Sequence, residues 1–104
     1  MIAQPKPRTF RSPRFLSWLR TLACAWCGRW APSEASHHGR HGMGQKAPDT
    51  SAIPLCSRCH RDHHDGRGLV DSNGERMTGD ATREWAERRA AELVARFLET
   101  GGRL

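Results

Sequence analysis

The chain has 104 residues, a formal net charge of +6 and a hydrophobic fraction of 37%. One domain is the default for this length, and so short a chain buries a small core that often needs a metal ion for stability. No apolar run approaches the roughly 18 residues of a membrane-spanning helix, and the N-terminus lacks the apolar segment of a signal peptide. We therefore expect a cytoplasmic protein without membrane association, in which paired cysteines bind metal rather than form disulfides.

Arginine dominates the positive charge. Of the 17 basic residues 15 are arginine, and residues 1–30 contain six basic residues and no acidic one. Arginine can bind a phosphate group with two parallel hydrogen bonds, which favours a nucleic-acid partner, although a basic tail can also serve solubility alone. Residues 1–11 have two prolines and no apolar periodicity. We predict a flexible basic arm over 1–11 and a single domain over 12–104.

The first predicted elements are a helix and a strand. Ser12-Pro13 is typical of a helix N-terminus, and apolar residues at helical spacing extend this helix over about 13–21. A metal-binding turn and then an extended strand that ends at His37-His38 are expected over 23–38. A glycine-rich loop over 39–50 should follow.

The remaining predicted elements are a short strand and two helices separated by a loop. A short edge strand is predicted over 51–55, because Pro54 cannot donate to a neighbouring strand. A short helix over 56–65, stopped at Gly66, and a loop over 66–79 should come next. The last element is a long amphipathic helix from about 80 to 100, capped by Thr78 or Asp80. The expected fold class is α+β, with a short N-terminal helix and a longer C-terminal one.

The four cysteines form two CxxC motifs, Cys24-Ala25-Trp26-Cys27 and Cys56-Ser57-Arg58-Cys59. Tetrahedral zinc takes four ligands, and two such turns supply four thiolates. Because a four-thiolate zinc has no open coordination position, we predict a structural role for it. Free thiols or a redox CxxC are the alternatives, which the matched spacing and the absence of a βαβ pattern disfavour. Trp26 and Trp30 are expected to pack around the first turn.

All six histidines lie between positions 37 and 64. His60 and His64 are four residues apart on the predicted helix and share one face, whereas His37 and His38 point to opposite sides of an extended strand. If the strand end packs against the helix, His37, His60 and His64 can share one divalent cation. His38 would then stand near the same site as a neutral base. His63 should point elsewhere, since it lies about 100° around the helix from His64.

Four basic residues flank the histidines and are predicted to contact the phosphates of nucleic acid. They are Arg40, Lys46, Arg58 and Arg61. Solubility is the alternative explanation for each of them.

Three segments together resemble the HNH (ββα-metal) endonuclease family, and more narrowly its phage-borne, recombination-associated members of the Ref and Rap type. The segments are Glu34-Ala35-Ser36-His37-His38, then Gly42-Met43-Gly44-Gln45-Lys46-Ala47-Pro48-Asp49, then Ile53-Pro54-Leu55-Cys56-Ser57-Arg58-Cys59-His60. The resemblance covers roughly residues 14–68. It implies a small zinc-stabilised domain in which two strands and a helix hold one catalytic cation.

The resemblance also implies roles for individual residues. The second histidine of the doublet, His38, would be the general base, and the first, His37, would be a metal ligand together with His60 and His64. The middle asparagine of the family has no counterpart in this chain. Asp49 is the nearest candidate to orient the base, with Ser51 as a weaker substitute.

These observations predict a metal-dependent DNA endonuclease of low sequence specificity, and the resemblance implies a phage origin and a link to recombination or DNA processing. Its expected cofactors are a structural Zn²⁺ and one catalytic divalent cation: Mn²⁺, Mg²⁺, Ni²⁺, Co²⁺ or Zn²⁺. Three imidazoles favour the transition metals over Mg²⁺, which prefers oxygen ligands. Besides DNA, a second copy of the chain or a recombination protein is a possible partner. The alternative is a non-catalytic zinc-ribbon module that binds nucleic acid or a partner protein.

Overall fold

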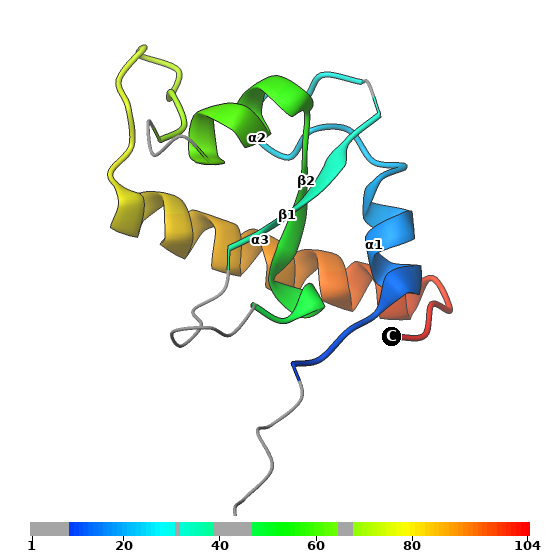
Figure 1. The fold of residues 1–104 in the computed structure, drawn as a ribbon. Helices are drawn as coiled ribbons and strands as arrows, with labels where there is room; N and C mark the ends of the chain where they lie inside the picture. The colour runs from blue at the N-terminus through cyan, green and yellow to red at the C-terminus, as the bar shows by residue number, and fades with distance from the viewer. Residues whose placement is uncertain (1–8, 31, 39–46, 65–67) are drawn as a thin grey trace, which may run out of the picture.

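The computed structural model describes residues 9–30, 32–38, 47–64 and 68–104 (Figure 1). Its elements, in chain order, are α1 (Pro13–Leu19), β1 (Glu34–His37), the 3-10 helix η1 (Asp49–Ser51), β2 (Ala52–Leu55), α2 (Ser57–His64) and α3 (Gly79–Glu99). The α+β class with a short first helix and a long last helix is confirmed. The expected stop at Gly66 and most of the glycine-rich loop lie outside the described residues.

Helix α1 begins where the sequence predicts. The hydroxyl of Ser12 accepts a hydrogen bond from the backbone N–H of Phe15, and Pro13 opens the first turn. Phe15 is fully buried, and its ring packs edge-on against Phe97 of α3 with centroids 5.4 Å apart. The helix ends at Leu19, earlier than predicted, because the backbone N–H groups of Thr21 and Leu22 bond three residues back and tighten the last turn.

The sheet consists of β1 and β2 paired antiparallel, with Glu34 opposite Leu55 and His37 opposite Ala52. Pro54 fits this sheet because each strand of a two-stranded sheet has one free edge. Its carbonyl accepts a hydrogen bond of 2.8 Å from the N–H of Ala25, which joins β2 to the first CxxC turn. Ser36 and His38 are buried while His37 is exposed, so the predicted opposite orientation of the histidine doublet is confirmed.

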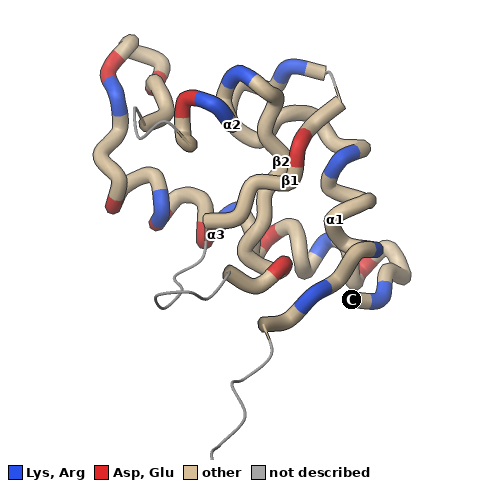
Figure 2. Tube along the Cα trace, in the orientation of Figure 1, with Lys and Arg blue, Asp and Glu red and all other residues tan. Residues whose placement is uncertain are grey.

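Helix α3 packs against β2, η1 and α1 and passes beneath the sheet in Figure 1. Of the two predicted caps, Thr78 is the one whose hydroxyl accepts the N–H of Ala81. The buried face of the helix carries Thr82, Ala86, Ala90, Leu93 and Phe97. Basic and acidic residues share its outer surface (Figure 2), as in the exposed ion pair of Arg89 with Glu92. This is the solvated face that the sequence predicts.

Two tryptophans tie α3 to the rest of the domain. The indole of Trp18 packs on Phe97 with ring centroids 5.1 Å apart, and Trp26 meets Trp85 edge-on at 4.9 Å. Trp26 also donates from Nε1 to the carbonyl of Val70, so it packs beside the cysteine turn as expected. The same expectation is wrong for Trp30, which is 83% exposed. No helix in the described ranges is long and apolar enough to cross a membrane.

Candidate functional site

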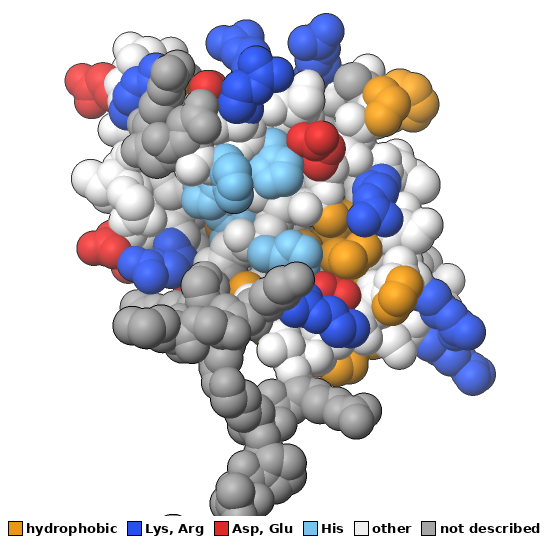
Figure 3. All heavy atoms as spheres, viewed as in Figure 1, with side chains coloured by type: hydrophobic (Ala, Val, Ile, Leu, Met, Phe, Trp, Pro, Cys, Tyr) orange, Lys and Arg blue, Asp and Glu red, His pale blue; other side chains and the backbone are white. Residues whose placement is uncertain are grey.

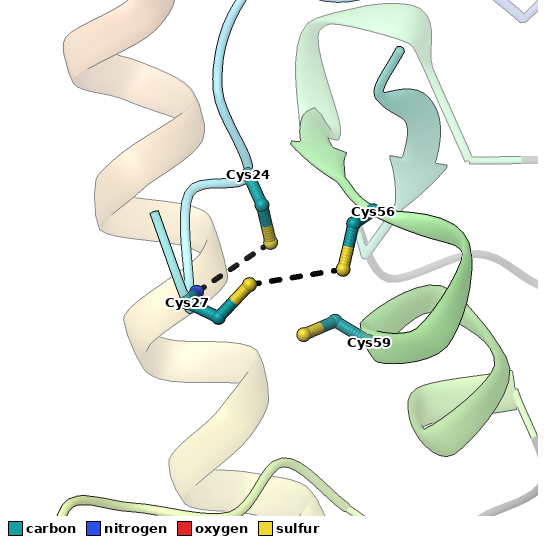
Figure 4. A group of neighbouring side chains, drawn as sticks. All are labelled: Cys24, Cys27, Cys56 and Cys59. Atoms are coloured by element: carbon teal, nitrogen blue, oxygen red, sulfur yellow. Dashed lines mark hydrogen bonds between the residues drawn. The ribbon is translucent and has the colours of Figure 1, made fainter. Parts of the chain in front are cut away.

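The four cysteines converge from two separate places in the chain (Figure 4). Cys24 and Cys27 lie in the turn after α1, whereas Cys56 and Cys59 lie at the junction of β2 and α2. Their Sγ atoms all lie within 4.8 Å of one another. Four thiolates about 2.3 Å from a tetrahedral ion would be about 3.8 Å apart, and Sγ of Cys27 is 3.7 Å from Sγ of Cys56. The cluster can therefore hold one metal ion, as predicted.

The electrostatics of the cluster favour a cation. Burial raises the pKa of the Cys24 thiol, but backbone N–H groups of Cys27, Cys56 and Trp26 outweigh burial and lower that pKa to about 7. Burial and the neighbouring sulfurs raise the pKa values of Cys27 and Cys59. One thiol thus ionises readily while its neighbours resist further negative charge. A bound cation removes that repulsion, which is why four thiolates and a divalent ion form a stable unit.

His37 lies at the end of β1 and bonds to Asp49. Its Nε2 is 2.8 Å from Oδ1 of Asp49, which is 1% exposed. Oδ1 also accepts from Nη1 of Arg11 at 2.9 Å, and Oδ2 accepts from the N–H of Ser12 at 2.7 Å. Burial alone would raise the pKa of Asp49, but these three hydrogen bonds lower it below its usual range. Asp49 therefore orients His37, whereas the sequence analysis expected it to orient the base His38.

His38 points the opposite way, into the protein. It is 6% exposed, and its Nε2 is 2.9 Å from Oγ of Ser36. Its ring lies against that of His63 from α2, with centroids 4.0 Å apart and planes inclined by 33°. Burial, reinforced by His63 and then by His60 and His37, lowers the pKa of His38 to about 3. This imidazole is consequently neutral at any physiological pH.

The other two histidines of α2 lie beside the same surface hollow, on one side of the helix, as their spacing predicts. His60 and His64 line a surface hollow of about 310 Å³ together with Glu34, Ser57 and Arg61. Nδ1 of His60 is 3.0 Å from Oε1 of Glu34 across the gap between α2 and β1. The rings of His60 and His64 have centroids 6.0 Å apart. Glu34 thus fixes the orientation of His60 and leaves its Nε2 for another partner.

Histidine side chains therefore gather on one face, over α2 and the end of β1 (Figure 3). Within the described ranges, the cysteines form the one group of three or more His, Cys, Asp or Glu side chains with ligand atoms within 4.8 Å of one another. The expected ligand set of His37, His60 and His64 does not converge that closely. Of the predicted phosphate contacts, Arg58 and Arg61 are exposed on α2, while Arg40 and Lys46 lie outside the described residues.

Sequence reasoning missed some partners of these histidines. The sequence analysis expected His63 to point away from the site, but it contacts His38. A usable signal was present, because His63 follows the buried Cys59 by one helical turn and so shares its inward face. The predicted basic arm includes Arg11, but its guanidinium pairs with Asp49. Glu34 was noted only as part of a motif.

Comparison with known proteins gives a family without a described activity. The model of the family described as "Protein of unknown function (DUF968)" matches residues 1–81. The chain is 36% identical over 98 residues to "Uncharacterized protein YdfU" of Escherichia coli (strain K12). That match covers 91% of this chain but 24% of the relative, so the chain spans about a quarter of the relative's length. No solved structure matches it significantly. The match over residues 1–81 shows that the chain belongs to the DUF968 family.

Proposed function

We propose that this chain is a metal-dependent DNA endonuclease of the HNH type, in which the four cysteines bind a structural zinc. The observation that carries the proposal is the histidine-rich face formed by α2 and the end of β1 (Figure 3). An antiparallel strand pair followed directly by a helix agrees with the ββα-metal arrangement that the sequence resemblance implies. The cysteine cluster sits at the β2–α2 junction, where a bound zinc would hold that helix against the strands.

The site offers an imidazole suited to activate water. Nε2 of His37 must carry a hydrogen to bond the ionised carboxylate of Asp49, so in the neutral ring Nδ1 has the lone pair. The His37 side chain is 32% exposed, within reach of a solvent water. A positioned imidazole of this kind can accept the proton of a water that attacks a phosphodiester. We therefore assign the general base to His37.

His38, the base that the resemblance implies, fits that role less well. A general base works best when its pKa lies near the working pH. The pKa of His38 is about 3, and its ring is buried between Ser36 and His63. A divalent cation held by imidazoles would supply charge stabilisation for the phosphate during hydrolysis. His38 suits the binding of such an ion better than the removal of a proton.

Exposed arginines give the site a means of holding DNA. Arg61 lines the same hollow as His60 and His64, and Arg29 and Arg58 line a hollow of about 210 Å³ next to the cysteine cluster. Each arginine that contacts a phosphate should steepen the salt dependence of DNA binding by about one unit of slope. No sequence feature indicates base-specific contacts, so we infer low sequence specificity.

The experiment incubates zinc-loaded protein with supercoiled plasmid and Mn²⁺ and compares wild type, His37→Ala and Arg89→Ala. Wild type and Arg89→Ala should nick the plasmid, since Arg89 pairs with Glu92 on the outer surface of α3. His37→Ala should lose activity by about 10²–10⁴-fold, the usual contribution of a general base. Circular dichroism and zinc content verify that the variants are folded. DNA binding without nicking by wild type would favour the zinc-ribbon alternative and reject the nuclease.

A further inference from the structure

The buried imidazole of His38 has an unused nitrogen. Its Nδ1 is fully buried and has no hydrogen-bond partner in the described part of the chain. A buried polar atom left unpaired costs about 1–3 kcal/mol. Native proteins rarely leave such atoms unpaired, so a missing partner is worth seeking.

The contact with Ser36 indicates what that partner is. If the Ser36 hydroxyl donated to Nε2, Nδ1 would carry a buried N–H with no acceptor. If Nε2 donates to Ser36 Oγ, at 2.9 Å, Nδ1 instead presents a lone pair. The second arrangement avoids a buried N–H without an acceptor. The lone pair of a neutral imidazole can also bind a metal ion.

His63 places a second imidazole ring beside that of His38. The two ring centroids are 4.0 Å apart, and the partly buried His63 extends from the last turn of α2. Two imidazole nitrogens that each lie about 2.0–2.1 Å from one ion are separated by about 3–3.4 Å. The His63 ring is already beside that of His38, so rotation about its side-chain bonds is the movement by which it would reach this geometry.

We propose that His38, through Nδ1, and His63 bind one divalent transition-metal cation, a ligand pair different from His37, His60 and His64. Imidazole nitrogen favours Zn²⁺, Ni²⁺ or Co²⁺ over Mg²⁺. Two protein ligands leave open coordination positions on such an ion. The biological purpose of the site rests on the proposed nuclease function, but the binding itself does not require DNA.

The experiment titrates protein that already holds one zinc per chain with further Zn²⁺ by calorimetry, without DNA. Wild type should bind a second equivalent. His63→Ala should weaken that binding by more than the roughly 10–100-fold that a supporting residue costs. The matched control His64→Ala, one residue further along α2 and exposed, should bind as wild type does. His63 is only partly buried, so its variant should fold even if His38→Ala does not.

A second measurement identifies the ligating atom. Long-range ¹H–¹⁵N spectra of the imidazole rings should shift Nδ1 of His38 on addition of the second zinc, while Nε2 keeps its protonated signature. Absence of a second zinc in wild type, or its loss in His64→Ala with retention in His63→Ala, would overturn the inference. Because plasmid nicking is assayed separately, a second zinc without nicking would reject the nuclease and leave this site standing.

Discussion

Replacement of Asp49 by asparagine isolates the contact that joins the N-terminal segment to the histidine face. The carboxylate is 1% exposed and accepts hydrogen bonds from three donors: Arg11, His37 and the backbone of Ser12. Asparagine has nearly the same shape but only one acceptor oxygen. Whichever way the amide is placed, its NH₂ group faces at least one of these donors. The substitution therefore tests the hydrogen bonds with little change in packing.

The expected loss in free energy of unfolding follows from the burial of each donor. A buried donor left unpaired, such as the Ser12 N–H, costs about 1–3 kcal/mol, and loss of the charged partner weakens the bond to His37 further. Arg11 is 41% exposed, so solvent limits its ion pair to at most about 1 kcal/mol. Asp49→Asn should thus lower the free energy of unfolding by about 2–4 kcal/mol at pH 7.

Urea unfolding of the zinc-loaded proteins, followed by tryptophan fluorescence, measures this difference. Because unfolding releases the metal, all variants must be compared at equal protein and zinc concentrations. The matched control is Glu92→Gln, which removes an exposed carboxylate paired with Arg89 and should change stability by less than about 0.5 kcal/mol. If Asp49→Asn were as stable as this control, the hydrogen-bond network around Asp49 would not contribute as argued.

Two further predictions concern metal and backbone. A strong zinc chelator should unfold the domain, because the binding energy of a metal at four thiolates is largely folding energy. The measurement is a loss of helical circular dichroism that added Zn²⁺ restores. A chelated protein that kept its helices would contradict this. Gly68→Ala should destabilise by about 1–3 kcal/mol, since Gly68 has a φ of +75° and an added Cβ would lie 2.5 Å from the carbonyl oxygen of Met77. Gly74→Ala is its control in a urea titration: with a φ of +80° and no atom within 4 Å of the added Cβ, it should cost only the backbone strain, about 1–2 kcal/mol.

The cysteine cluster and the main elements could be predicted because their signals are local. A CxxC turn brings two thiols together whatever surrounds it, and Ser12-Pro13 or Thr78 determines a helix start within one turn. The apolar stripe of α3 likewise depends only on its own period. The helix signals need no knowledge of how distant segments pack, and the meeting of the two CxxC turns could be predicted because zinc takes four ligands.

The partners of the histidines depend on tertiary packing, which is why several were missed. The order His37-His38 establishes that the two rings oppose each other, but not which one faces inward. The register of β1 against β2 buries His38 and leaves His37 beside η1, where Asp49 meets it. Trp30 shows the same limit, because proximity to Cys27 in sequence did not bring it into the core.

The orientation of α2 about its own axis connects the cysteine cluster to the histidines. Cys59 is buried because its sulfur belongs to the cysteine cluster, and His63 lies four residues later on the same helical face. The inward position of Cys59 therefore aims His63 at His38, whereas His60 and His64, each one position further on, line the surface hollow with Glu34. A metal at the cysteines would thus set which histidines can meet. Loss of that metal should disorder the His38–His63 pair, so binding of a second zinc should require that the first site be filled.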